Sequence, residues 1–159
     1  MAHLPEWQRF TDRARKVILL AEREALQRGV HLVDTHHILL ALTGEGGGVG
    51  ANVLRNLEVP YGRVVNALSG ATSESEQRGV FSEMTVGNAL PAFTLDAKEL
   101  LKLAADEASR LRHNYIGTEH LLLGMCMQAD SNAVKVLRLM GVDPEIVRAD
   151  VIDLFGSAE

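Results

Sequence analysis

The sequence predicts an all-α fold in which eight helices form two four-helix repeats, related by a pseudo-twofold axis and packed into one domain. Apolar residues make up 47% of the 159 residues and aromatic residues only 4%, so the core must be built from Leu, Val, Ile and Ala, which favours helices. Apolar residues also recur at three- and four-residue steps, as in helices with one buried face. Finally, the second half of the chain repeats the first at a constant offset of 83 positions.

The first repeat is assigned to residues 10–68 and follows a polar lead-in over residues 1–9. Thr11 is the expected N-cap of its first helix, and Gly29 is the expected stop. Residues 44–48 are expected to form a loop, because glycine this dense does not hold a helix. Three further helices are expected over residues 35–43, 49–57 and 60–68.

A polar stretch of small residues over 69–92 is expected to be a linker, because most of it lacks an apolar period. The pattern then restarts in the second repeat, residues 93–155, where Phe93-Thr94 corresponds to Phe10-Thr11. The sequence Asp143-Pro144-Glu145 supplies a cap, a first-turn proline and a first-turn acid to the last helix. Each unit has little apolar surface to bury alone, so the two repeats are expected to share one core.

The most informative stretch begins an apolar helix of the second repeat and reads Gly117-Thr118-Glu119-His120. Thr118 is expected to cap this helix through its hydroxyl, and Glu119 places a carboxylate at the positive end of the helix dipole. The first-repeat copy reads Asp34-Thr35-His36-His37, so it keeps the threonine and the last histidine but replaces the glutamate. His37 and His120 are expected to be partly buried and bonded to backbone carbonyls.

Composition restricts the class of partner. The net charge of −5 disfavours nucleic-acid binding through a phosphate-neutralising surface. The chain shows no signal peptide and no run as long as a membrane span, so no membrane partner is expected. Cys126 is the only cysteine, and a chain without a disulfide framework fits a reducing compartment, here the cytoplasm. Cys126 lies in an apolar run and is interpreted as a small buried hydrophobe rather than a catalytic thiol.

The opening Arg9-Phe10-Thr11-Asp12-Arg13-Ala14, together with Gly117-Thr118-Glu119-His120-Leu121-Leu122-Leu123-Gly124 in a tandem repeat, resembles the double Clp repeat. This repeat is the N-terminal domain of Clp-type AAA+ unfoldases, and the resemblance is closest to the ClpC class. It implies a compact eight-helix pseudo-dimer that is not itself an enzyme. It also implies that the domain binds adaptor proteins and substrate polypeptides and passes them to a Clp ATPase ring or protease core, without a cofactor.

In ClpC-type relatives the glutamate of this motif also binds phosphorylated arginine in each repeat. The resemblance therefore implies a phosphoarginine-type site at Thr118 and Glu119. The equivalent at Thr35 and His36 is expected to be degenerate, because a histidine cannot accept a bidentate guanidinium. The interpretation that needs no ligand, a helix cap followed by a dipole-compensating acid, also stays open.

The chain has no Walker A loop, so it cannot hydrolyse ATP in the manner of the family. Two interpretations remain: a domain of a full unfoldase, or a free-standing Clp-repeat accessory protein that docks on and modulates a Clp ring or protease core. An unrelated helical enzyme or ligand-binding bundle is disfavoured, because no catalytic constellation is visible. No metal site is expected, because the histidines show no ligand spacing.

A protein-binding groove is a further expectation, where the first helices of the two repeats meet near the pseudo-twofold axis. The alternative is that the same residues complete the buried interface between the repeats. The expected groove residues come from both first helices: Phe10, Arg13, Val17, Leu20, Phe93, Leu100 and Leu103.

Overall fold

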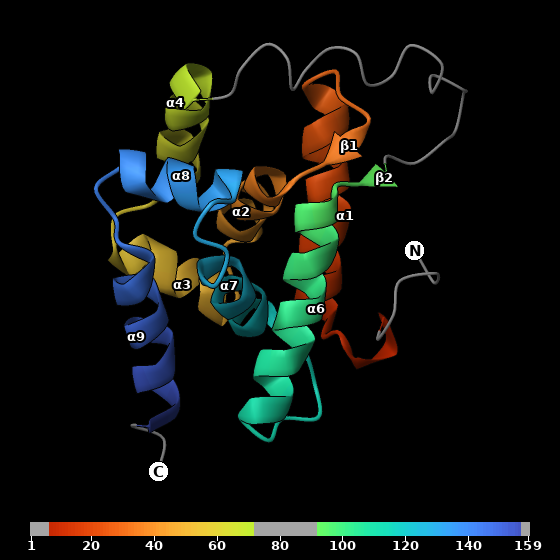
Figure 1. The fold of residues 1–159 in the computed structure, drawn as a ribbon, viewed down its shortest axis with the longest axis vertical. Helices are drawn as coiled ribbons and strands as arrows, with labels where there is room; N and C mark the ends of the chain where they lie inside the picture. The colour runs from red at the N-terminus through yellow and green to blue at the C-terminus, as the bar shows by residue number, and fades with distance from the viewer. Residues whose placement is uncertain (1–6, 72–91, 157–159) are drawn as a thin grey trace.

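The computed structural model describes residues 7–71 and 92–156, and in these ranges it contains eight α-helices (Figure 1). The all-α prediction is confirmed. The first repeat contains a 3-10 helix and four α-helices: η1 (Trp7–Arg9), α1 (Asp12–Gln27), α2 (Thr35–Glu45), α3 (Val49–Asn56) and α4 (Tyr61–Ala71). The second repeat contains the other four: α6 (Leu95–Arg110), α7 (Thr118–Cys126), α8 (Asn132–Leu139) and α9 (Pro144–Gly156).

The first helices of the two repeats begin in the same way. The hydroxyl of Thr11 accepts the amide hydrogen of Ala14 at 3.1 Å, and the hydroxyl of Thr94 accepts that of Ala97 at 3.0 Å. Each threonine thereby satisfies one of the amides that a helix start leaves without a partner. Helix α1 then packs on α2, and α6 packs on α7.

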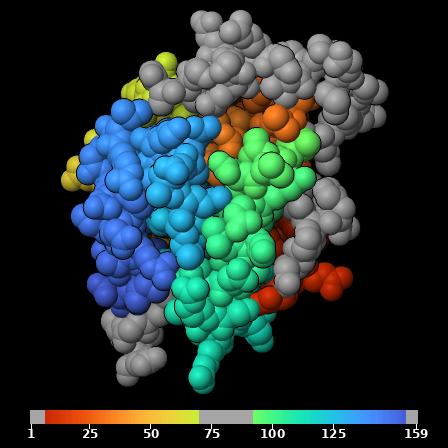
Figure 2. Space-filling model, viewed as in Figure 1, coloured from red at the N-terminus to blue at the C-terminus, as the bar shows by residue number. Residues whose placement is uncertain are grey.

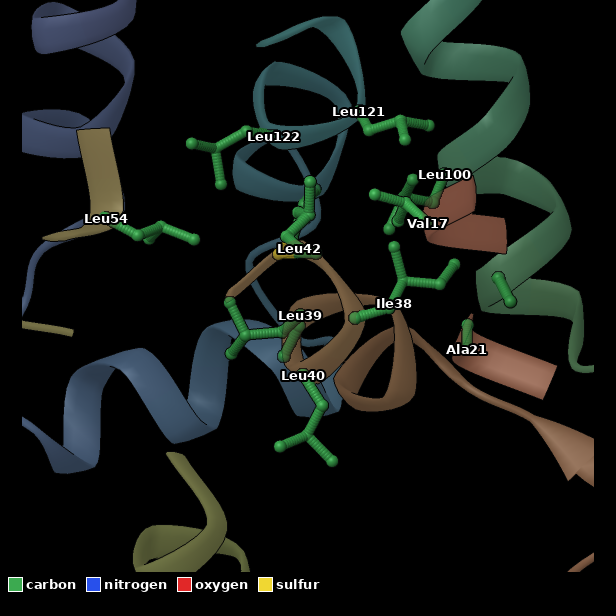
Figure 3. Packing of buried hydrophobic residues seen from close by; sticks show 14 of the residues in the cluster. Val17, Ala21, Ile38, Leu39, Leu40, Leu42, Leu54, Leu100, Leu121 and Leu122 are labelled. Carbon is green, nitrogen blue, oxygen red and sulfur yellow. The ribbon is translucent and has the colours of Figure 1, made fainter. Parts of the chain in front are cut away.

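The two repeats interlock rather than sit side by side. Helix α2 of the first repeat packs against α8 of the second, and α7 of the second packs against α3 of the first. Helices α2 and α7 lie at the centre, where Leu42 of α2 points toward α7 and Ile38 lies near Val17 of α1 and Leu100 of α6 (Figure 3). A helix covered on all sides is apolar around its whole circumference, which explains the unbroken run of apolar residues after each cap.

Two short strands, absent from the sequence-based prediction, also join the repeats. Strand β1 (Leu32–Val33) runs parallel to β2 (Ala92–Phe93), with Val33 opposite Phe93. At the pseudo-symmetric position Phe10 forms a parallel bridge with Ile116. Each pairing ties the start of one repeat to the segment that enters the central helix of the other.

The boundaries of the expected linker differ from the prediction at both ends. Residues 69–71 belong to α4 and Ala92 belongs to β2, while residues 72–91 lie outside the described part of the chain. The lead-in likewise ends in η1, and residues 1–6 lie outside that part. Among the described residues, no helix is both long and apolar enough to cross a membrane.

Four of the expected groove residues are buried, so the prediction of an exposed groove is wrong for them. Phe10, Val17, Phe93 and Leu100 belong to the core, where they complete the interface between the repeats. The physical reason is the interlocked packing, which leaves the inner faces of α1 and α6 no solvent. Figure 2 shows the surface of the molecule on which α6, α8 and α9 are seen together.

The other three predicted groove residues remain accessible to different degrees. Arg13 is exposed, while Leu20 and Leu103 are half-buried. Leu20 lines a hollow of about 490 Å³ between α1, α2 and α4, together with Glu24 and Tyr61. The Tyr61 hydroxyl donates to the Glu24 carboxylate at 2.8 Å in this hollow, so its lining mixes polar and apolar groups.

Candidate functional site

Helix α7 begins one residue earlier than the threonine-cap prediction requires. Its N-cap is Gly117, whose backbone is extended, and Thr118 is its first helical residue. The amide of Gly117 donates to Nδ1 of His120 at 2.9 Å, which closes a capping box from the side of the histidine. The prediction that Thr118 caps its own helix is therefore wrong.

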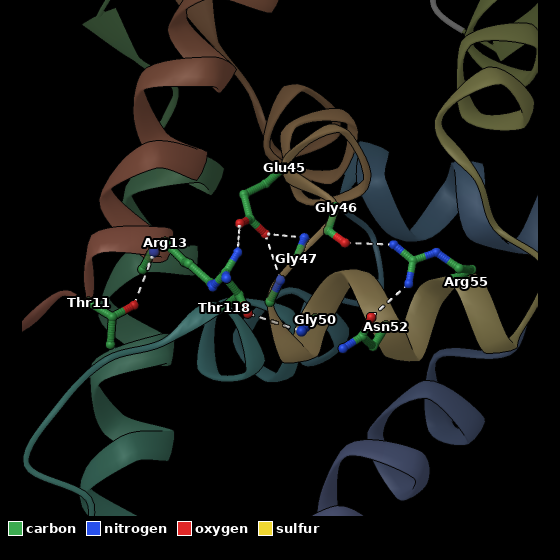
Figure 4. Close-up of polar contacts among 11 residues, drawn as sticks. Thr11, Arg13, Glu45, Gly46, Gly47, Gly50, Asn52, Arg55 and Thr118 are labelled. Carbon is green, nitrogen blue, oxygen red and sulfur yellow. Dashed lines mark hydrogen bonds and ion pairs between the residues drawn. The ribbon is translucent and has the colours of Figure 1, made fainter.

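The hydroxyl of Thr118 instead caps a helix of the other repeat. It accepts the amide hydrogen of Gly50, in the first turn of α3, at 3.0 Å (Figure 4). Thr35 makes the same contact in the opposite direction, because its hydroxyl accepts the amide hydrogen of Ala133 in α8 at 3.0 Å. The two threonines that both repeats keep thus hold the repeats together.

His37 and His120 occupy equivalent positions and accept hydrogen bonds at Nδ1, the reverse of the expected donation to a carbonyl. His37 accepts from the amide of Asp34 at 2.9 Å, as His120 does from Gly117. Burial, followed by the nearby His36, lowers the pKa of His37 to about 3. Burial, followed by His113, lowers the pKa of His120 to about 4. Both rings are therefore neutral near pH 7.

The neutral His120 ring continues into a small aromatic cluster. Because Nδ1 of His120 is an acceptor, its Nε2 carries the hydrogen, and this atom lies 2.8 Å from Nδ1 of His113. The His113 ring stacks on Tyr115 with centroids 5.0 Å apart. Among the described residues, no three His, Cys, Asp or Glu side chains converge as metal ligands.

Glu119 lies at the start of α7 and is only 7% exposed. Its carboxylate folds back over Gly117, since a Cβ atom added to Gly117 would lie 2.6 Å from Glu119 Oε1. Burial, together with the charge and hydrogen bond of Glu119, raises the pKa of the Tyr115 hydroxyl, so Tyr115 borders the carboxylate. Within the described residues the amide of Thr118 has no acceptor. The start of α7 therefore places an acid beside a backbone amide that no acceptor in the described residues occupies, both in residues that are largely buried.

The first repeat also has a carboxylate at the start of its central helix, α2, but this carboxylate belongs to Asp34. The Asp34 side chain caps α2 by accepting the amide hydrogen of Thr35 at 2.7 Å. The sequence-based reading missed this role because it compared only the glutamate position. The signal was present, since Asp34 corresponds to Gly117 at the offset of 83.

An exposed cation stands beside the start of α3. The Arg13 guanidinium donates to the Glu45 carboxylate at 2.6 Å, and Glu45 also accepts the amides of Gly47 and Gly48 at 3.1 and 2.8 Å (Figure 4). Burial opposes ionisation of Glu45, but the bonds from Arg13 and these two amides outweigh it and lower the pKa of the carboxyl. Arg13 thus braces the loop before α3, next to the residue that Thr118 caps.

Cys126 ends α7 and is half-buried. Burial raises the pKa of its thiol to about 12. The thiolate, which is the nucleophilic form, is therefore scarce at neutral pH. This environment fits the interpretation of Cys126 as a small hydrophobe.

Comparison with known sequences identifies related proteins. The family model of the Clp repeat (R) N-terminal domain matches residues 9–90 and 92–159. Over 150 residues the chain is 41% identical to the chloroplastic chaperone protein ClpC1 of Arabidopsis thaliana. It is also 41% identical over 150 residues to a ClpA homolog, an ATP-binding subunit of the ATP-dependent Clp protease, of Porphyra purpurea. Both matches cover 94% of this chain but only 15% and 17% of the relatives, so the chain spans about a sixth of their length.

Solved structures show the same fold. The N-terminal domain of ClpD from Arabidopsis thaliana superposes with a TM-score of 0.77 at 22% identity, covering 94% of this chain and 96% of that one. The N-domain of ClpV from Vibrio cholerae gives a TM-score of 0.68 at 19% identity, covering 89% and 82%. At these identities the likeness extends to the fold alone.

Proposed function

Because this chain belongs to the family of Clp repeat N-terminal domains, we propose that it is a non-catalytic protein-binding domain of a Clp chaperone or protease system. Its partners are adaptor proteins and substrate polypeptides, which it presents to a Clp ATPase ring or protease core. The absence of a disulfide framework in the sequence supports a reducing compartment such as the cytoplasm.

We further propose that the start of α7 binds phosphorylated arginine on such polypeptides. The observation that carries this proposal is the Glu119 carboxylate beside the Thr118 amide. A carboxylate pairs with a guanidinium through charge-assisted hydrogen bonds, and the amides of a helix start accommodate a phosphate. One short stretch therefore offers complementary groups to both ends of a phosphoarginine side chain.

The two residues contribute differently. Glu119 supplies its side chain, which lies next to the Tyr115 hydroxyl. Thr118 supplies its backbone amide, because its hydroxyl is already bonded to Gly50. Replacing Glu119 should therefore remove binding without disturbing the contact between the repeats.

Titration of phosphoarginine into wild type and Glu119→Ala, followed by calorimetry, tests the proposal. Glu145→Ala is a matched control, because Glu145 is the exposed second residue of α9, as Glu119 is the second residue of α7. We expect Glu119→Ala to weaken binding by about tenfold or more, the loss of a charge-assisted pair, and Glu145→Ala to leave it unchanged. Equal affinities of wild type and Glu119→Ala would overturn the assignment. Arginine and inorganic phosphate, titrated separately, show whether both ends of the ligand are needed.

A further inference from the structure

The two repeats differ at the residue before the threonine that both of them keep. In the first repeat this N-cap is Asp34, and in the second it is Gly117. Asp34 carries a carboxylate on the end of α2, whereas Gly117 leaves the end of α7 without a capping side chain. The N-cap residue thus supplies a capping carboxylate in the first repeat and no side chain in the second.

The Asp34 carboxylate is bound by donors from both repeats. One oxygen accepts the Thr35 amide at 2.7 Å and the Thr94 hydroxyl at 2.9 Å. The other accepts the side-chain amide of Asn132 at 2.6 Å and lies 3.5 Å from Nδ1 of His36. The side chain is only 14% exposed. This set of groups, converging from three segments, is how proteins bind a small anion.

The electrostatics agree with this geometry. Burial disfavours the charged form of Asp34, but hydrogen bonds from His36, Asn132 and the Thr35 amide outweigh it and hold the pKa of the carboxyl well below its usual range. Asp34 is therefore ionised at every pH at which the protein is expected to work, and its charge is matched by local donors.

We infer that Asp34 is a built-in anion that occupies the first-repeat counterpart of the proposed phosphoarginine pocket. It is Asp34, and not only the loss of a glutamate at His36, that closes this counterpart to an external phosphate. The inference rests on the proposed function for the identity of the ligand. It assigns Asp34 as a specificity-determining residue that restricts ligand binding to one repeat.

The replacement of the glutamate by His36 follows from the same arrangement. A glutamate at position 36 would place a second carboxylate beside Asp34, where like charges repel. A histidine avoids this repulsion and lies within 3.5 Å of Asp34. His36→Glu alone should therefore not restore binding, whereas Asp34→Gly with His36→Glu recreates the Gly-Thr-Glu-His motif of the second repeat.

The test uses phosphoarginine as the probe and backbone amide NMR as the readout, in a Glu119→Ala background that silences α7. We expect D34G/H36E/E119A to bind the probe about tenfold or more tightly than H36E/E119A, with shifts at the Thr35 and Thr94 amides. Glycine is tolerated at this cap in the second repeat, and Asp34→Ser, which keeps a hydroxyl cap, replaces it if the glycine variant does not fold. Equal binding by the two proteins, or no binding by either, would overturn the inference.

The converse substitution, made at the start of α7, tests the inference independently. Gly117→Asp should place a carboxylate where Glu119 now folds back and weaken wild-type binding by about tenfold or more, while Gly117→Ser, without the charge, should weaken it less. Unchanged binding by Gly117→Asp would count against the role of Asp34. Failure of the proposed function is distinguishable, because it would appear as an absence of shifts at Thr118 and Glu119 in wild type, whatever the first-repeat variants do.

Discussion

Thr118 Oγ1 lies 3.0 Å from the amide nitrogen of Gly50, so a side chain of the second repeat completes the start of a helix in the first. Thr35 returns the contact by accepting the amide hydrogen of Ala133. All four residues belong to helix starts at the centre of the molecule. The two bonds are related by the pseudo-twofold axis. Each one supplies a helix start in one repeat with an acceptor from the other repeat.

Thr118→Val should destabilise the fold, because valine keeps the shape of the side chain but leaves the buried amide of Gly50 without an acceptor. Such a loss costs about 1–3 kcal/mol in the free energy of unfolding. Urea denaturation measures it. Thr43→Val is the matched control, since the Thr43 hydroxyl only donates to Leu40 within its own helix, and it should cost about 0.5 kcal/mol or less. Equal losses in the two variants would contradict the structural role of Thr118.

The unfolding free energy should fall as the pH is lowered from about 6.5 toward 4. His37 and His120 have pKa values of about 3 and 4 in the folded state, while an unfolded histidine titrates near 6.5. In this window the unfolded chain binds protons that the folded chain does not, so each histidine removes about 1.4 kcal/mol per pH unit. The contribution is fully present above pH 6.5.

His37→Gln isolates the contribution of one ring. Glutamine can accept the Asp34 amide hydrogen as His37 does, and it does not titrate. Denaturant titrations at several pH values should therefore show a shallower slope for the variant than for wild type. Parallel slopes would mean that His37 is not held neutral by the fold.

Gly124→Ala should be destabilising despite the higher helix propensity of alanine. A Cβ atom at this position would lie 2.8 Å from the backbone nitrogen of Ala104 and 2.8 Å from the carbonyl oxygen of Leu100, so α7 would have to move away from α6. Overpacking of this kind costs about 1–3 kcal/mol. Gly62→Ala in α4 meets no atom within 4 Å and should instead be neutral or stabilising by up to about 1 kcal/mol. Thermal unfolding of the two variants should therefore shift in opposite directions or differ by several degrees.

The Cys126 thiol should react slowly with iodoacetamide in the folded protein. With a pKa of about 12, its thiolate at pH 8 is about a thousandfold scarcer than that of an ordinary cysteine. Mass spectrometry of the native protein should show little alkylation under conditions that label the protein fully in 6 M urea. Equal rates in the two states would show that the thiol is accessible and ionised.

The sequence was sufficient for the parts of the fold that depend on local patterns. The cap at Thr11, the stop near Gly29 and the proline start of α9 all depend on residues close in the chain, and they lie where predicted. The crossing of α3 and α8 into the opposite repeat could not be predicted, because apolar periodicity says which face is buried but not against which helix. The burial of Phe10 and Leu100 follows from that crossing.

The candidate site was predictable to a similar extent. The motif located Glu119, and the loss of the glutamate at His36 was visible by alignment of the repeats. The role of Asp34 was not predicted, because its meaning depends on Thr94 and Asn132, which are 60 and 98 positions away in the chain. The true partner of the Thr118 hydroxyl was missed for the same reason.

The exchange of caps between the repeats has the geometry of an isologous dimer whose two protomers share one chain. In a dimer of identical subunits, any change at one binding site appears at both, because symmetry copies it. Covalent joining removes this constraint while the interface stays reciprocal. Asp34 and Gly117 illustrate this at one pair of equivalent positions. The bonds of Thr35 and Thr118 keep the twofold relationship between the repeats, while the N-termini of α2 and α7 have become chemically different.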